Sequence, residues 1–199
     1  FDFKVGRGVL IPRDDTEVVV NLCIDFLKNR TDKKTVDLCS GSGAIAVALD
    51  KISGAEVTAV EIDETAFSYL ETNVKENNSS VKPVMADALE ICDTFADGEL
   101  DLIVSNPPYI KSADIETLQK EVRLEPRLAL DGGEDGYDFY REIVSRWSRK
   151  LKKGGALAFE LGENQADAVK ALMTDKGFSD FKISLDFGGV QRAIIGTLL

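Results

Sequence analysis

The feature that most limits the fold of this chain is its alternation of short apolar segments with helix-like segments. Five runs rich in strand-forming residues span 34–38, 55–62, 81–86, 100–105 and 155–161. Segments of helical character separate them, among them Ala44 to Lys51, Glu64 to Glu76 and Tyr137 to Leu151. Alternation of this kind predicts a doubly wound α/β fold with a mainly parallel sheet.

Both ends of the chain depart from this alternation. Two strand-like runs, 178–187 and 191–199, have no helix between them, which predicts a closing antiparallel hairpin and seven strands in all. Residues 1–30 hold a loop and then an amphipathic helix from about Thr16 to Lys28, with Asp14 or Asp15 as its N-cap. We find no internal repeat or linker and expect one domain over residues 1–199.

Composition and charge narrow the possible functions. No uncharged apolar run approaches the roughly 18 residues that cross a bilayer, so we expect no membrane span. A net charge of −11 opposes a polyphosphate backbone and disfavours a nucleic-acid substrate. The three cysteines (Cys23, Cys39 and Cys92) are widely spaced, which fits a reducing cytoplasm.

The chain contains no histidine. Ser-His-Asp and Cys-His mechanisms and His-bound zinc are therefore excluded, and we expect no metal. The chemistry must proceed without imidazole.

A glycine loop follows the first predicted strand. Gly41 and Gly43 precede Ala46, and small residues here let the backbone approach a ligand and let the next helix pack on the strand. Glu61 stands 20 residues after Gly41, where an acidic residue would bind two ribose hydroxyls. The combination favours a nucleoside-containing cofactor over a structural turn.

Acidic residues at the predicted strand ends indicate which nucleoside-containing cofactor the site would bind. Asp37, Glu61 and Asp87 would repel the pyrophosphate of a nicotinamide cofactor. They suit S-adenosylmethionine, which carries a sulfonium, an ammonium and a ribose diol. Each acidic residue alone could equally be a solvated loop residue, and only the set favours this cofactor.

The tetrapeptide Asn-Pro-Pro-Tyr, residues 106–109, directly follows the fourth predicted strand. Pro107 disfavours a helical conformation at Asn106, and neither proline has an N–H. The corner is therefore rich in acceptors, namely the Asn106 side-chain oxygen and the Pro107 carbonyl. Two acceptors suit the two N–H bonds of a planar amino group and would direct its lone pair toward a methyl sulfonium.

Tyr109 would pack on that flat group or exclude water from it. The alternative is a rigid loop with a solvated Asn106, which is the ordinary reading of two prolines in a turn. The position of the motif at the carboxyl end of a strand, beside a glycine loop, favours a ligand site.

These stretches resemble the class I S-adenosylmethionine-dependent methyltransferases that act on planar amino groups, which have a Rossmann-like fold. Residues 8–20, 121–143 and 154–165 are similar to the HemK/PrmC family of protein-(glutamine-N5) methyltransferases. The likeness runs from about Val5 to the end of the chain. It implies methyl transfer from S-adenosylmethionine, leaving S-adenosylhomocysteine, to the glutamine amide in the Gly-Gly-Gln loop of a peptide chain release factor.

The resemblance assigns roles within the expected site. Residues 39–43 would line the methionine side of the cofactor, Glu61 the ribose, and Asp87 with Ala88 the adenine. The complete expected cofactor set is Asp37, Cys39, Ser40, Gly41, Ser42, Gly43, Glu61, Ile62, Asp87, Ala88 and Asn106. The glutamine amide would be held by Asn106, Pro107, Pro108 and Tyr109, with Asn106, Pro107 and Tyr109 catalytic. Cys39 and Glu61 depart from the family, where Gly and Asp are frequent.

Several points stay open at this level. The family carries an N-terminal helical domain that we expect upstream of Phe1, and we expect a monomer. A methyltransferase for exocyclic amines of DNA or RNA, and a non-catalytic cofactor-binding subunit, are the alternative functions. The basic cluster 145–153 is either a nucleic-acid contact or a cationic helix end, and 131–140 is either a lid or a loop. Arg13 and Glu17 either order the mouth of the site or form surface ion pairs.

Overall fold

A computed structural model describes residues 1–199, and its centre is a seven-stranded mixed sheet with the order β3-β2-β1-β4-β5-β7-β6. The strands are β1 Lys34–Leu38, β2 Glu56–Glu61, β3 Lys82–Met85, β4 Leu100–Ser105, β5 Leu151–Glu160, β6 Phe178–Leu185 and β7 Gln191–Leu198. Strands β1 to β5 pair in parallel, whereas β7 is antiparallel to both β5 and β6. The predicted parallel sheet and closing hairpin are confirmed.

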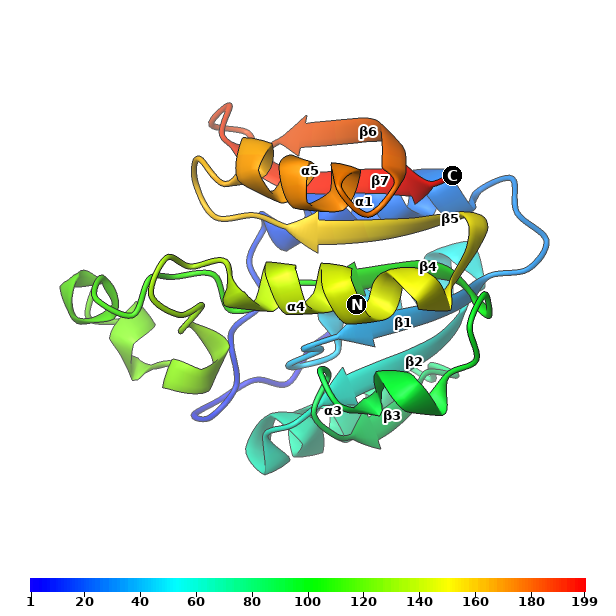
Figure 1. The fold of residues 1–199 in the computed structure, drawn as a ribbon. Helices are drawn as coiled ribbons and strands as arrows, with labels where there is room; N and C mark the ends of the chain where they lie inside the picture. The colour runs from blue at the N-terminus through cyan, green and yellow to red at the C-terminus, as the bar shows by residue number, and fades with distance from the viewer.

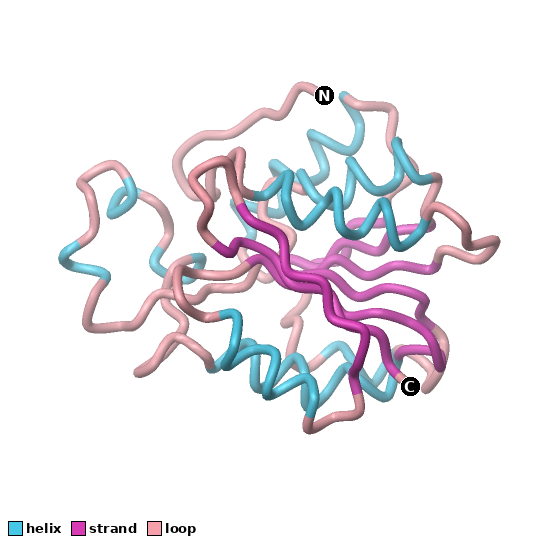
Figure 2. Tube along the Cα trace, turned by 90° about the horizontal axis from the view of Figure 1, so that it is seen from above, coloured by secondary structure: helices cyan, strands magenta, loops and turns pink.

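Helices cover both faces of the sheet (Figure 2). One face carries α1 Thr16–Leu27, α2 Ala44–Ala48 and α3 Glu64–Glu76, and the other carries α4 Asp138–Trp147 and α5 Ala166–Thr174. Each face buries its own apolar cluster, as expected of a parallel sheet whose strands are covered on both sides. None of the helices combines the length and apolar character needed to span a membrane.

Two predicted helices end earlier than expected. The helix from Ala44 becomes a π-helical turn at Leu49–Ser53, and the helix predicted to reach Leu151 ends as α4 at Trp147, followed by a short 3-10 turn. Strand β5 then begins at Leu151, four residues before the predicted start. The sequence does not indicate this start, because Leu151 is followed by two lysines and two glycines, which are not typical of a strand.

Asp15 occupies the predicted N-cap position of α1, but its side chain makes no capping hydrogen bond. Asp15 precedes the helix with helical backbone angles and its carboxylate does not bond the first-turn N–H groups. It lies instead 3.2 Å from Nε of Arg192 on β7. A long-range ion pair replaces the local cap, which a single sequence does not reveal.

The topology places the ends of β1 and β4 side by side. The chain runs outward from β1 through β2 to β3 and returns to β4 on the other side of β1. Leu38 is paired with Ser105, whose hydroxyl donates to the Leu38 carbonyl at 2.7 Å. Ligands of open α/β sheets bind at such a switch point, outside the carboxyl ends of the strands.

Residues 111–131 project beyond this same edge of the sheet (green in Figure 1). The segment contains three short 3-10 turns, at Ile115–Thr117, Val122–Leu124 and Arg127–Ala129. It therefore flanks the edge where a ligand is expected.

Candidate active site

A cleft opens at the carboxyl edge of the sheet and contains most of the predicted site residues. Its lining includes the predicted residues Cys39, Ser40, Gly41, Ser42, Glu61, Ile62, Asp87, Ala88, Asn106 and Pro108. Four further predicted residues do not line the cleft, although each lies within two positions of a residue that does. They are Asp37, Gly43, Pro107 and Tyr109. The glycine loop and the Asn-Pro-Pro motif thus share one cavity.

The two glycines of the loop are needed for different reasons. Both have positive φ, +54° at Gly41 and +83° at Gly43, which favours glycine. A β-carbon on Gly41 would meet no atom within 4 Å, so the space there is open to a ligand. A β-carbon on Gly43 would lie 2.4 Å from Cδ1 of Leu70, so this glycine lets α3 pack close to the loop.

Glu61 joins the ends of β1 and β2. Its carboxylate is 8% exposed and accepts N–H bonds from Gly41 at 2.7 Å, Ile62 at 2.8 Å and Asp63 at 2.9 Å. A carboxylate has about four acceptor positions, so roughly one is left for a ligand hydroxyl. Glu61 therefore fixes the glycine loop as well as lining the cleft.

Asp37, at the end of β1, is the opposite case. Its side chain is completely buried and neither carboxylate oxygen has a hydrogen-bond partner. Burial is the main cause that raises the pKa of Asp37 to about 7, and the charge of Glu61 acts in the same direction. The nearby Ser40 side chain and Ala46 N–H, neither of them in hydrogen-bonding geometry, act against it. A buried carboxylate without a partner is unfavourable, and a nearby cationic ligand group would favour its ionised form. This orphaned group fits a cofactor that carries an ammonium.

The third acidic position lies at the far end of the cleft. Asp87 accepts the N–H of Leu89 at 2.7 Å and so shapes the turn that follows β3. The carbonyl of Ala88 accepts the indole N–H of the fully buried Trp147 at 2.8 Å. These bonds fix the backbone of both cleft-lining residues and leave an apolar surface for a flat ring.

The acceptor motif continues directly from β4. Asn106 and Pro108 line the cleft, whereas the Tyr109 hydroxyl donates to Glu160 on β5 at 3.4 Å. Burial and the neighbouring charge of Glu160 raise the pKa of Tyr109, so the phenol stays neutral. The polar end of Tyr109 is thus held by the protein.

Two segments that the sequence did not single out residue by residue also line the cleft. They are the N-terminal loop, through Gly8, Val9, Leu10 and Pro12, and the projecting segment, through Pro126, Leu128 and Ala129. Arg13 joins them with one nitrogen 3.1 and 3.0 Å from the two oxygens of Glu125. Both segments belong to stretches with family resemblance, but their pairing across 112 residues left no local signal.

The thiols are not placed for chemistry. Cys23 and Cys92 are buried and none of the three cysteines is in a disulfide. Cys39 lines the cleft, but burial raises the pKa of its thiol and the nearby carboxylates raise it further. A protonated thiol is a poor nucleophile.

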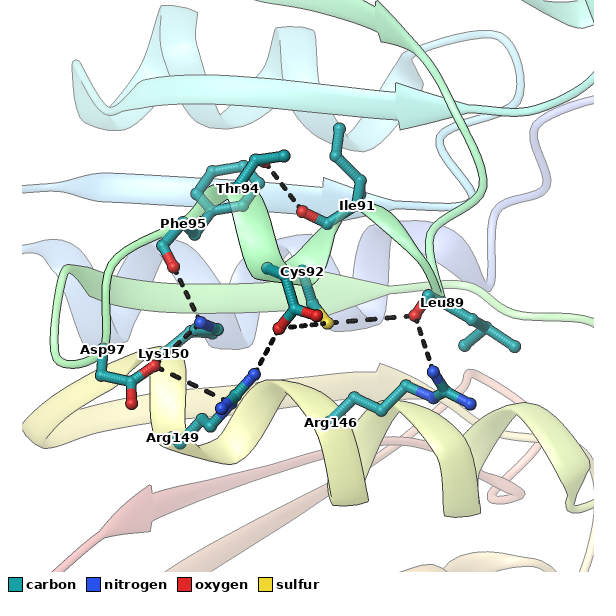
Figure 3. Close-up of polar contacts among 10 residues, drawn as sticks. Leu89, Ile91, Cys92, Thr94, Phe95, Asp97, Arg146, Arg149 and Lys150 are labelled. Carbon is teal, nitrogen blue, oxygen red and sulfur yellow. Dashed lines mark hydrogen bonds and ion pairs between the residues drawn. The ribbon is translucent and has the colours of Figure 1, made fainter.

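The basic cluster 145–153 is engaged in local contacts (Figure 3). Arg149 pairs with Asp93, and the ammonium of Lys150 lies 2.8 Å from both Asp97 and the carbonyl of Phe95. Arg146 bonds to Glu142 at 2.7 Å and to the carbonyl of Leu89 at 3.2 Å. These cations are largely paired within the protein, which supports a structural role over a nucleic-acid contact.

Comparison with known proteins agrees with this geometry. Residues 13–125 match the Methyltransferase small domain family. The chain is 38% identical over 199 residues to the "Release factor glutamine methyltransferase" of Clostridium acetobutylicum, covering 98% of this chain and 69% of that protein. It is 42% identical over 200 residues to the protein of the same name from Geobacter sulfurreducens, covering 99% and 68%.

A solved structure shares the fold. The N-terminal domain of human METTL16 in complex with SAH superposes with a TM-score of 0.70 at 17% identity, covering 99% of this chain and 75% of that one. At this identity the likeness concerns the fold alone, which is that of the class I methyltransferases.

Proposed function

Because the chain belongs to the release factor glutamine methyltransferase family, we propose that it transfers the methyl group of S-adenosylmethionine to the side-chain amide nitrogen of a glutamine in a release factor. The observation that carries the proposal is the shared cleft. The glycine loop and Glu61 line it from β1 and β2, and Asn106 and Pro108 line it from β4. A cofactor and an acceptor bound there would be adjacent.

The cofactor half would be held by the residues that end the first three strands. Open space over Gly41 admits the methionine part, and the orphaned carboxylate of Asp37 favours its ammonium. Glu61 offers its remaining acceptor position to a ribose hydroxyl, and the backbone at Asp87 and Ala88 frames the adenine. S-adenosylmethionine supplies an electrophilic methyl group on a sulfonium.

The acceptor half would orient a weak nucleophile. An amide nitrogen has a delocalised lone pair, so its two hydrogens need acceptors that turn the lone pair toward the methyl group. The Asn106 side-chain oxygen and the Pro107 carbonyl are those acceptors, and they stabilise the positive charge that develops on nitrogen. As the N–C bond forms, the S–C bond breaks to leave S-adenosylhomocysteine, and one amide proton is released to solvent. The apolar surfaces of Pro108 and the projecting segment exclude water.

The test is a transfer assay with labelled S-adenosylmethionine. The acceptors are a purified release factor, the same factor with its Gly-Gly-Gln glutamine changed to alanine, tRNA and duplex DNA. We expect label on the release factor and none on its alanine variant. Label on nucleic acid, or equal label on both forms of the factor, would overturn the proposal.

A further inference from the structure

Tyr109 is held at both of its polar ends by one short segment, which runs from the end of β5 to the start of α5. Its hydroxyl donates to Oε1 of Glu160 at 3.4 Å, and its carbonyl accepts from Nε2 of Gln165 at 3.1 Å. Neither Glu160 nor Gln165 lines the cleft. They touch the acceptor motif from behind.

Gln165 makes three hydrogen bonds of its own and shares a fourth. Its oxygen accepts from the N–H of Gly162 at 2.9 Å and lies 3.2 Å from the hydroxyl of Tyr140, whose single proton is shared with the nearer carbonyl of Glu160 at 2.9 Å. Its nitrogen donates to the carbonyls of Tyr109 at 3.1 Å and Gly136 at 3.2 Å. Only a glutamine or asparagine side chain has two donors and two acceptor positions on one amide, and at 7% exposure water does not replace them.

Glu160 carries the contact on to the first helix. Its second oxygen accepts the hydroxyl of Thr16 at 2.7 Å, and Thr16 lines the cleft. The carboxylate is 4% exposed, and burial raises its pKa. The other charged groups that act on it are Asp15 and Arg13, both at the start of α1.

The shape of the surroundings gives independent support. Three glycines pack closely against Tyr109, so that a β-carbon would clash with it at Gly132 and Gly136 and be tight at Gly162. At Gly132 it would lie 2.7 Å from Cα of Tyr109, at Gly136 2.6 Å from its carbonyl oxygen, and at Gly162 3.0 Å from its ring. Tyr109 is therefore held by contact on several sides as well as by its two hydrogen bonds.

We propose that Glu160 and Gln165 are positioning residues for methyl transfer, which hold Tyr109 and thereby fix the Asn106 amide and the Pro107 carbonyl against the acceptor. This inference rests on the proposed function. Because Tyr109 is one bond from Pro108 and three residues from Asn106, a displaced tyrosine moves the acceptors. Misplacement of about 1 Å can cost roughly 100-fold in rate.

The test compares variants of Glu160 and Gln165, together called the clamp, with a control in the 3-10 turn that precedes β5. Gln165→Met keeps the length and removes its hydrogen bonds, and Glu160→Leu removes both of its bonds. We expect each to lower kcat with the release factor by about 10- to 100-fold while the Kd of S-adenosylmethionine stays within about 3-fold. Glu160→Gln keeps an acceptor for Tyr109 and should retain most of the activity.

The control is Lys150→Met, directly before β5 and thus at the opposite end of that strand from Glu160. It removes partly buried hydrogen bonds to Phe95 and Asp97, at the other end of β5 from the acceptor motif, and should lower the Tm with kcat unchanged. A purely structural clamp predicts the same for Gln165→Met, namely a lower Tm and normal kcat in the folded protein. That result, or equal losses of kcat and cofactor affinity, would overturn the inference.

A second measurement does not depend on catalysis. The amide of Ile110, the residue after Tyr109, donates to the carbonyl of Leu130 at 2.9 Å, so hydrogen exchange at Ile110 reports on the motif. Gln165→Met should speed exchange there, whereas Lys150→Met should not. Unchanged exchange in Gln165→Met would contradict the positioning role. Absence of methyl transfer to a release factor by the wild-type protein would refute only the proposed function.

Discussion

The two ends of the cleft are built on opposite principles. At the cofactor end, the carboxylate of Asp37 is buried without any hydrogen-bond partner. At the acceptor end, both polar ends of Tyr109 are bonded within the protein, and the Gln165 amide donates two hydrogen bonds, accepts one from Gly162 and shares the Tyr140 hydroxyl with Glu160. Unmet bonding capacity suits the capture of a charged ligand, whereas a saturated network suits the orientation of a weak nucleophile. The comparison predicts that substitutions at the two ends separate affinity from rate.

The largest effect is expected at the acceptor end. Asn106→Ala removes an acceptor for the amide hydrogens and should lower kcat by about 100- to 1000-fold, in the range found when one polar group that stabilises developing charge is lost. The Kd of S-adenosylmethionine should stay within a few-fold. Single-turnover transfer and calorimetry measure the two quantities. Large and equal losses in both would remove the distinction between the two ends.

The next effect is expected at Glu61. Glu61→Ala removes a charged acceptor from Gly41, Ile62 and Asp63, and we expect the Kd of S-adenosylmethionine to rise by about 10- to 100-fold, the equivalent of one or two charged hydrogen bonds. With saturating cofactor, kcat should recover to within a few-fold.

Calorimetry measures the Kd of S-adenosylmethionine, and the Tm of the cofactor-free protein is measured beside it. If Glu61 only holds the glycine loop in place, Glu61→Ala should lower the Tm and leave the Kd of the folded protein nearly unchanged. An unchanged Kd would mean that Glu61 does not contact the cofactor.

The sequence was sufficient for the strands, the hairpin and the motif positions, because these depend on local residue patterns. It was insufficient where two distant segments meet. Thr16 and Glu160 are separated by 144 residues and Arg13 and Glu125 by 112, and no local pattern relates them. The bare state of Asp37 was equally hidden, since it depends on the helices that cover β1. Ten of the predicted site residues line the cleft, whereas the contacts that support them could not be predicted from the sequence.

The buried carboxylate of Asp37 should make the free energy of unfolding depend on pH. An aspartate has a pKa near 3.9 in an unfolded chain, whereas that of Asp37 is raised by burial to about 7 in the folded protein. Between these values the folded state binds more protons, so the free energy of unfolding falls as pH rises from about 4 to about 7. Asp37→Asn should therefore stabilise the cofactor-free protein at pH 8, by a few kcal/mol at most, with less gain toward pH 4.

The measurement is the free energy of unfolding of wild type and Asp37→Asn from pH 4 to pH 8. Asp50 is the matched control. There desolvation is outweighed by hydrogen bonds from Ser79 and Ser80, which lower its pKa, so Asp50→Asn should destabilise the protein at pH 8. The same Asp37→Asn variant should bind S-adenosylmethionine more weakly. A pH-independent difference between wild type and Asp37→Asn would show that the carboxylate is not held bare.

The smallest effect is expected at Cys39, where the cofactor end carries backbone strain. Its φ is +58°, in the left-handed region that costs a non-glycine residue about 1 to 2 kcal/mol. Cys39→Gly relieves that cost but adds freedom to the unfolded chain, so the net gain in the free energy of unfolding should be about 0.5 to 1 kcal/mol. Urea unfolding measures it, with Cys39→Ala as the control that removes the sulfur and keeps the β-carbon. Strain predicts that only the glycine variant is stabilised. Equal stabilisation of the two variants would trace the effect to loss of the thiol rather than to backbone strain at Cys39.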